Sequence, residues 1–264
     1  PATPTYLFHD YQRTLPLVWL LLVFVVAVLA FGRWQGARAL TGLAGSLLVL
    51  ALFVLPALLR DSPALPVALS ASALVAFLAI YLSHGFNLGS SIALAGTLIS
   101  LAATTLLALL VASLAQITGL ATDEGRYLQM AAGSLDMRGL LVAGIVIGAL
   151  GVIDDLTVSQ VSTVGALRHA NPNLTGRQVY AGAIRVGRDH VAAAVNTLVL
   201  AYAGASLPLL LVYSQGTLPL EQMLTNELVA AEVIRMLVGS VGLILSVPIT
   251  TGLAALIVRP PPPR

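Results

Sequence analysis

The sequence predicts an all-α protein, a polytopic bundle of about seven transmembrane helices. Of its 264 residues, 58% are hydrophobic and only 9% are charged, whereas a soluble domain carries roughly 25% charged residues. Long stretches without a charged residue recur along the chain, and most reach the roughly 20 residues that cross a bilayer. We therefore expect a multi-pass membrane protein whose outer surface is covered by lipid.

The composition also excludes several kinds of chemistry. The chain has no cysteine, which excludes disulfides and thiolate ligands, and all 13 basic residues are arginine, which excludes a Schiff-base lysine. The net charge of +2 is too small to indicate nucleic-acid binding. The four histidines lack the spacing of metal ligands, so we expect no metal site and no cofactor other than a bound monovalent cation.

The spans follow from the uncharged runs in chain order. Six runs predict spans directly, at residues 14–32, 39–59, 62–83, 85–122, 190–220 and 236–258. The remaining span, fifth in order, starts at Gly139 and is too short by itself. It becomes a full span if the helix continues through Asp154 and Asp155 to about Leu167.

The arginines predict how these spans are oriented. With the N-terminus outside, the inner segments hold eight arginines and the outer segments hold five, and a surplus of basic residues marks the cytoplasmic side. We expect residues 1–13 to be an extracytoplasmic end that follows a preceding domain. Residues 14–258 form the bundle, and 259–264 form a cytoplasmic tail.

The inner segment 168–189 is longer than a turn requires. Thr175 followed by Gln178 has the spacing of a capping box, which starts a helix. The apolar residues Leu174, Val179 and Ala183 predict a short interfacial helix there. Alternatively, the arginines of this segment only fix the topology.

Two adjacent aspartates lie inside the apolar fifth span, and a helical wheel separates them. One stripe on this helix recurs at spacings of four, three, four, four and three residues and falls within an arc of about 80°. Asp154 instead shares a face with Ile147 and Leu150. We therefore expect Asp155 to face the interior of the bundle, as a member of the stripe Gly144, Gly148, Gly151, Asp155, Ser159 and Ser162.

Other spans carry similar stripes of small and polar residues. On the sixth span, Asn196 follows Asp189 by seven residues, so the two lie on the same face of the helix. Because membrane helices pack through small residues, such stripes are either packing faces or the lining of a path. The remaining members are Gly96, Ser100 and Thr104 on the fourth span and Arg235, Gly239, Gly242 and Ser246 on the seventh.

An aspartate in the middle of a span requires a different explanation from glycine or serine. Its insertion costs about 2.5–3.5 kcal/mol, and such residues usually serve a function. A carboxylate in apolar surroundings, beside a second carboxylate, is suited to taking up a proton or binding a cation. We predict an ion-coupling set in which proton and sodium stay equally open: Asp155, Ser159, Ser162, Asp154, Asp189 and Asn196.

Several segments resemble the YibE/F-like family of bacterial membrane proteins. They are "GRWQGARALTGLAGSLLVL", "YLSHGFN", "GIVIGALGVIDDLTVS", "VGRD", "NTLVLAYAGASLPLLL" and "EVIRMLVGSVGLILSVPITT". The resemblance implies a bacterial inner-membrane protein in which Asp155 is the recurrent aspartate of the pair. It also implies that Asp189, Asn196, Glu227, Glu232 and Arg235 match family positions.

A shorter stretch, residues 145–184, looks like the central helix and following loop of resistance–nodulation–division transporters and Sec accessory subunits. In those proteins a glycine-rich helix leads to an aspartate that takes part in proton-driven conformational change. The lysine partner usual in those proteins has no counterpart here, because the chain lacks lysine.

The sequence favours a transporter or permease component that is coupled to protons or cations through Asp155. Two other classes stay open: a non-transporting membrane module that anchors or regulates a larger complex, and an intramembrane hydrolase using Asp155 and Asp189. The small-residue faces suit a homodimer or a partner membrane or extracytoplasmic subunit. The transported ion or small molecule is not identified by any motif.

Overall fold

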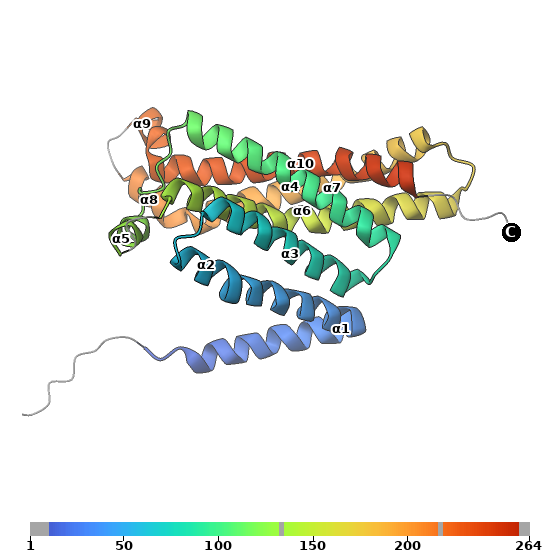
Figure 1. Cartoon of the computed structure of the whole chain (residues 1–264), viewed down its shortest axis with the longest axis horizontal. Helices are drawn as coiled ribbons and strands as arrows, with labels where there is room; N and C mark the ends of the chain where they lie inside the picture. Colours follow the sequence, from blue (N-terminus) through green and yellow to red (C-terminus); the bar gives the residue numbers. More distant parts are fainter. Residues whose placement is uncertain (1–10, 132–134, 216–218, 259–264) are drawn as a thin grey trace, which may run out of the picture.

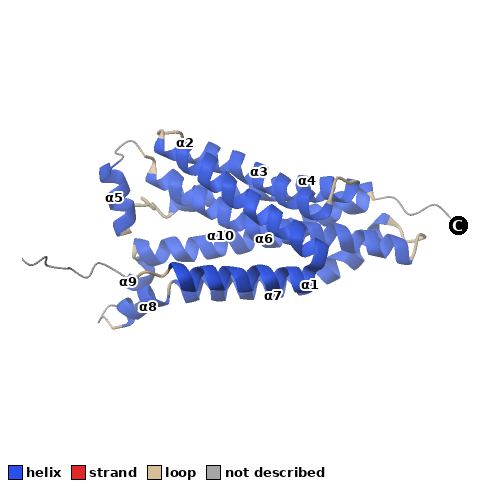
Figure 2. Ribbon diagram, turned by 90° about the horizontal axis from the view of Figure 1, so that it is seen from below, coloured by secondary structure: helices blue, strands red, loops and turns tan. Residues whose placement is uncertain are grey.

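A computed structural model describes residues 11–131, 135–215 and 219–258, and within this part every regular element is a helix (Figure 2). The predicted end segments 1–10 and 259–264 lie outside the described residues. In chain order the helices are α1 Thr14–Val49, η1 Leu50–Val54, α2 Leu55–Leu59, α3 Ala64–His84, α4 Leu88–Leu114, α5 Asp123–Ala131, α6 Met137–Ala170, α7 Gly176–Ala205, α8 Leu207–Ser214, α9 Leu220–Thr225 and α10 Glu227–Ile257.

Five of these helices, or six, are long and apolar enough to cross a membrane in the described part of the chain. The sixth counts only if α7 and α8, which meet at a bend of 61°, form one span. The first of the five is the 46-residue run Thr14–Leu59, which contains two predicted spans. The described helices therefore confirm a multi-pass helical protein. By length and apolar composition they give five or six spans, fewer than the seven predicted from the sequence.

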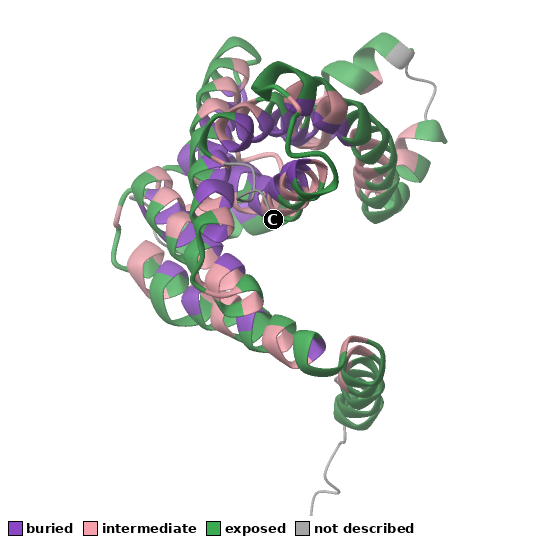
Figure 3. Ribbon diagram, turned by 90° about the vertical axis from the view of Figure 1, so that its right-hand side faces the viewer, coloured by how far each residue is buried: buried purple, intermediate pink, exposed green. Residues whose placement is uncertain are grey.

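The long first run is not straight. Arg33 has a non-helical backbone (φ 48°, ψ −126°), and the chain folds back there, so that Gly36 lies against the backbone carbonyl of Val28. Figure 1 shows the two arms of this run as separate helices that meet at this turn and diverge from it. They correspond to the predicted spans 14–32 and 39–59. The first arm, apolar and almost entirely exposed, stands apart from the bundle (Figure 3).

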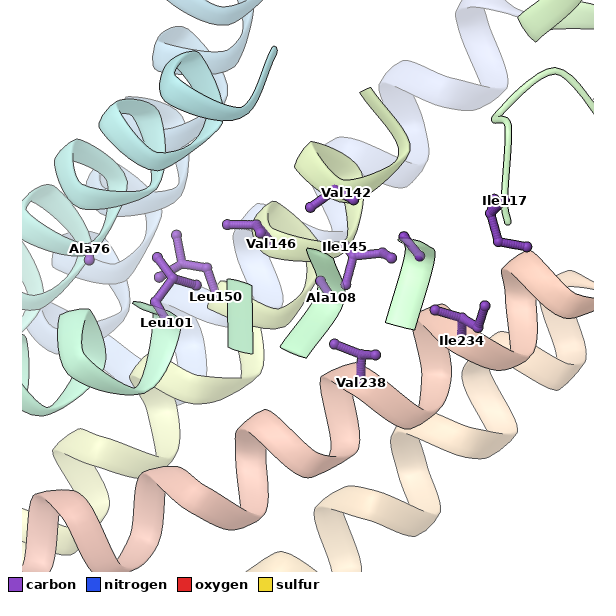
Figure 4. Close-up of a cluster of buried hydrophobic side chains, with 11 residues drawn as sticks. Ala76, Leu101, Ala108, Ile117, Val142, Ile145, Val146, Leu150, Ile234 and Val238 are labelled. Atoms are coloured by element: carbon purple, nitrogen blue, oxygen red, sulfur yellow. The ribbon is translucent and has the colours of Figure 1, made fainter. Parts of the chain in front are cut away.

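The centre of the bundle is formed by α4, α6 and α10, which pack against one another. Their contact surface contains a cluster of buried aliphatic side chains that includes Leu101, Val142, Val146 and Val238 (Figure 4). On one side α3 packs against both α6 and α1, and on the other side α7 packs against α10 and α6. The helix that carries the aspartate pair thus has neighbours on several sides.

α6 continues through both aspartates without a break, and this agrees with the sequence prediction. The helix starts at Met137, where the Asp136 side chain accepts a hydrogen bond of 3.0 Å from the Gly139 amide, and ends at Ala170. Asp154 lies 17 residues after this start and 16 before this end. The carboxylates are therefore close to mid-length of a helix that is longer than the membrane core.

The predicted capping box at Thr175 and Gln178 is confirmed at the start of α7. The short interfacial helix predicted after it is wrong, because the helix continues without a break to Ala205. Its small and apolar residues Val179, Ala183 and Gly187 are buried inside the protein. An apolar face that suits the membrane surface suits a neighbouring helix equally well, and here it packs against the bundle.

Glu227, at the start of α10, fixes the connection that follows α4. Its carboxylate accepts hydrogen bonds from the amides of Thr118 and Gly119, at 2.6 and 2.8 Å, and from the Thr118 hydroxyl. The backbone of Gly119 needs glycine, since its φ is +79° and a Cβ would overlap the carbonyl of Met137. This contact holds the two central helices α4 and α10 together at one end.

Candidate ion-coupling site

Both aspartates line one cavity of about 410 Å³ between the second arm of α1, α3 and α6. Asp154 is half-buried in its wall, and Asp155 is exposed at its edge. The amide of Asp155 donates a 2.9 Å hydrogen bond to Asp154 Oδ1. In the described part of the chain neither carboxylate has an ion-pair partner. The cavity therefore holds two carboxylates near mid-length of α6, and no cationic side chain of the described residues lines it.

The expectation that the Asp155 stripe faces the interior of the bundle is wrong for the single chain. Gly144, Gly151, Asp155 and Ser162 are exposed, and a Cβ added at Gly144 or Gly151 would meet no atom within 4 Å. The interior face of α6 is instead the one with Val142, Val146 and Ile153. In a membrane, apolar and small faces are equally able to pack inward, so the wheel identified the stripe but not its direction.

Two members of the stripe nevertheless face α7. A Cβ at Gly148 would lie 3.1 Å from the hydroxyl of Tyr202, and the Ser159 hydroxyl lies 3.2 Å from His190 Nδ1. His190 was not singled out from the sequence as a partner of this helix. α7 therefore covers part of the stripe and leaves its remaining positions open.

Asp189 and Asn196, also on α7, are both exposed. Neither lines the cavity that contains the aspartates, and no hydrogen bond joins Asp189 to Asp155 in the described part of the chain. The structure thus separates these two residues from the aspartate pair. Their predicted place in the ion-coupling set stays a prediction.

The stripes on the fourth and seventh spans meet each other. A Cβ at Gly96 of α4 would overlap the side chain of Thr250, and one at Gly242 of α10 would overlap Thr104. The hydroxyls of Ser100, Thr104 and Ser246 donate to backbone carbonyls of their own helices, at 2.7 to 2.8 Å. Gly239 lies next to the side chain of Leu198 on α7, at 3.5 Å. These residues form close helix contacts, as the packing interpretation predicted.

Arg235 belongs to a different region of the bundle. It pairs with Glu232 one turn earlier, at 3.8 Å, and both line a large cavity of about 640 Å³ between α5, α8 and α10. Glu227 lines the same cavity. Arg235 therefore lines a different cavity from the aspartate pair.

Three serines that the sequence did not single out lie around the aspartates. Ser46, Ser72 and Ser83 line the same cavity, and Ser72 is 1% exposed with a hydroxyl that has no hydrogen-bond partner. A stripe of small residues at spacings of seven and four (Ser72, Ala79, Ser83) marks this face of α3. The same wheel that was applied to the fifth span would have found it.

A second cavity, of about 360 Å³, follows the first along α3 and α6. It is lined by His84, Asn87, Ser90 and Ser162. His84 follows Ser83 directly, and Ser162 lies two helical turns beyond Asp155, so the two cavities succeed each other toward the α3–α4 turn. Among the described residues no three acidic or histidine side chains gather as a metal site.

The comparisons with known proteins identify a family. The family model described as YibE/F-like protein matches residues 20–260. No curated protein and no solved structure shows significant similarity to the chain. Since the match covers nearly the whole sequence, the chain belongs to the YibE/F-like family.

Proposed function

We propose that this protein is a membrane transporter or permease component, coupled to protons or monovalent cations through Asp155 and its neighbour Asp154. The observation that supports it is the position of the pair: both carboxylates line one cavity at mid-length of a spanning helix. A carboxylate at the bilayer centre costs about 2.5–3.5 kcal/mol to insert. Without a cationic partner, such groups are suited to bind and release a proton or a cation.

We infer that the second cavity, which lies between these carboxylates and one end of the bundle, forms part of a route to that side of the membrane. His84, Asn87 and Ser162 supply polar groups between the α3–α4 turn and Asp155. Beyond the aspartates, toward the α5 end, the packing between helices is aliphatic, with Val142, Val146 and Leu150. An ion would therefore reach the pair from the α3–α4 end, and a conformational change would be needed to open the other side.

The predicted topology assigns that end to the cytoplasm. Seven crossings, with the N-terminus outside, require that each arm of the Thr14–Leu59 run be a separate span. The arrangement in Figure 1 supports this: the Arg33 turn, the α3–α4 turn and the α6–α7 loop gather at one end of the bundle, and α5, α8 and α9 at the other. The arginine-rich segments then face the cytoplasm, as expected for a bacterial inner-membrane protein.

The test is to replace one carboxylate by an amide of the same shape. In liposomes with an imposed pH or sodium gradient, Asp155→Asn should abolish the flux that an internal dye reports for the wild type. The matched control is Asp123→Asn, because Asp123 is exposed on α5 and only pairs with Arg126 on the same helix. Wild-type flux in Asp155→Asn, with normal insertion of both variants, would refute the proposal.

A second candidate function is a membrane module that docks a partner, and the open face of α6 favours it. Gly144 and Gly151 present small surfaces with free space before them, which suits close approach of another helix. In this cysteine-free chain, Gly144→Cys should then form a disulfide between two copies in the membrane. Leu106→Cys, on the exposed side of α4, is the control that should stay monomeric. The third class, an intramembrane hydrolase that uses Asp155 and Asp189 together, gains no support, because Asp189 does not line the cavity that contains Asp155.

A further inference from the structure

We propose that the cavity between α1, α3 and α6 binds a small lipophilic organic cation, whose charged group lies against Asp154 and whose apolar body lies against the aliphatic wall. This proposal rests on the proposed transport function and names the class of substrate that the cavity would take. It follows from four properties of the cavity: its volume, its lining, an unpaired hydroxyl and its opening.

The volume exceeds what an inorganic ion needs. Each water molecule in the liquid takes about 30 Å³, so 410 Å³ is the volume of about a dozen waters. A proton needs only a carboxylate, and a bare monovalent ion needs only a few oxygen ligands. Cavities of about 300–1,000 Å³ are the size that holds small organic molecules.

The lining determines the sign of the charge. Among the residues that the structure describes, Asp154 and Asp155 are the only charged ones in its lining, and no arginine or histidine lines it. Anions are therefore repelled and cations attracted. The rest of the wall is aliphatic or small, apart from three serines, so it matches a cation with a substantial apolar part: Leu43, Leu47, Leu50, Val75, Ile147 and Leu150 supply the larger apolar surfaces.

Ser72 is independent evidence that the cavity receives an occupant. Its side chain is 1% exposed, and its hydroxyl has no hydrogen-bond partner in the described part of the chain. A buried polar group without a partner is unfavourable, and bound molecules or water normally satisfy it. Because Ser72 lines the same wall as Asp154, an occupant held by the carboxylate can also meet this hydroxyl.

The opening of the cavity suits a molecule that comes from the bilayer. α3 packs against both α1 and α6, while α1 and α6 do not pack extensively against each other. The lining residues Leu43, Leu47, Gly151 and Asp155 are exposed on this side. The cavity therefore opens laterally between apolar helices, so an amphiphilic cation dissolved in the bilayer can enter it from the side, whereas a hydrated inorganic ion cannot.

The test uses benzyltrimethylammonium as the probe and the purified full chain in nanodiscs, with equilibrium binding followed by titration calorimetry. Saturable binding is expected for the wild type, and Asp154→Asn should weaken it by about tenfold or more, because it removes the charge opposite the cation. Val75→Trp, which fills the cavity, should abolish binding. Neopentylbenzene, the uncharged isostere of the probe, should not compete.

Ser72→Ala should weaken binding several-fold, whereas Ser240→Ala should not. Ser240 is a similarly buried serine, 6% exposed, whose hydroxyl donates to Met236 on α10. All variants must elute as the wild type does and keep its unfolding temperature. Equal affinity of wild type and Asp154→Asn would overturn the proposal. The proposal would also be overturned if calorimetry showed that the wild type binds Na⁺ but not the probe, and that Asp154→Asn no longer binds Na⁺.

The outcome separates this proposal from the transport function itself. Absence of probe binding together with an Asp155-dependent ion flux would refute the organic substrate and leave coupled transport standing. Probe binding that depends on Asp154, together with wild-type flux in Asp155→Asn, would keep the cation site and refute the coupling role of Asp155.

Discussion

Asp154 and Asp155 differ by 100° around the helix, yet both contact one space. The cavity is wide enough to reach around the edge of α6, with Asp154 in its wall and Asp155 at its rim. A helical wheel divides residues into faces as if each face met a different neighbour. Here both aspartates line the same cavity between α1, α3 and α6, so the division into faces does not separate them.

A second polar pair lies buried between α6 and α10. The Thr251 hydroxyl donates a 2.9 Å hydrogen bond to Gln160 Oε1, and Gln160 Nε2 has no partner. We predict that Thr251→Val lowers stability by about 1 kcal/mol, because it leaves the amide oxygen buried and unpaired. Thermal unfolding in detergent measures this loss.

The double variant with Gln160→Met removes both partners and should recover part of the loss. A double-mutant cycle isolates their interaction. If the two single losses simply add, the residues do not stabilise each other and the hydrogen bond has no energetic role.

At the scale of elements, the central contact between α4 and α10 depends on glycine. Gly96 lies beside Thr250 and Gly242 beside Thr104, at contacts where a Cβ would overlap the opposite side chain. Lipid chains are as apolar as leucine, so helices in a membrane gain stability from close packing rather than from leaving water. These glycines therefore allow the approach that holds the centre of the bundle together.

We predict that Gly242→Ala destabilises the protein by about 1–3 kcal/mol, the usual cost of overpacking. The matched control is Gly144→Ala on α6, where a Cβ meets no atom within 4 Å. That variant should unfold at the same temperature as the wild type or slightly higher, since alanine favours helix. Equal behaviour of the two variants would contradict the close contact of α4 with α10.

The start of α7 depends on its capping box. Thr175 accepts a hydrogen bond from the Gln178 amide at 3.3 Å, and Gln178 Oε1 accepts one from the Thr175 amide at 2.9 Å. Thr175→Ala removes the cap and should cost about 1 kcal/mol. Hydrogen exchange should increase in the first turn of α7 and stay unchanged in α10. Unchanged exchange in both helices would show that packing alone fixes this terminus.

At the scale of the whole molecule, the fold-back at Arg33 decides the number of crossings. The natural sequence contains no cysteine, so single cysteines can be placed for labelling from either side of the membrane. We predict that Gln35→Cys and Asn173→Cys react from the cytoplasmic side and Glu124→Cys from the outside. Reaction of Gln35→Cys and Asn173→Cys from opposite sides would show that the two arms of α1 are not both crossings.

Much of the architecture was predictable because helix formation in a membrane is a local matter. Every backbone polar group must be paired within its segment, so long uncharged runs give helices wherever they occur. For this reason α6 continues through Asp154 and Asp155, and α7 starts at the capping box of Thr175. The prediction of a short interfacial helix after Thr175 was wrong for a related reason. The same amphipathic pattern allows a segment to pack on a membrane surface or on a neighbouring helix, and the sequence does not distinguish the two.

The amino-acid pattern alone was enough to predict a helical membrane protein, the positions of its main helices, a carboxylate pair in the middle of one of them, and the stripes of small residues. The packing of the helices was needed to learn which stripes meet, that the Asp155 stripe stays largely open, and that α1, α3 and α6 form a cavity lined by both aspartates. The physical reason is the solvent. In water, apolar residues mark the interior, but in lipid an apolar residue is equally stable inside and outside, so the direction of each helix face is set by its neighbours.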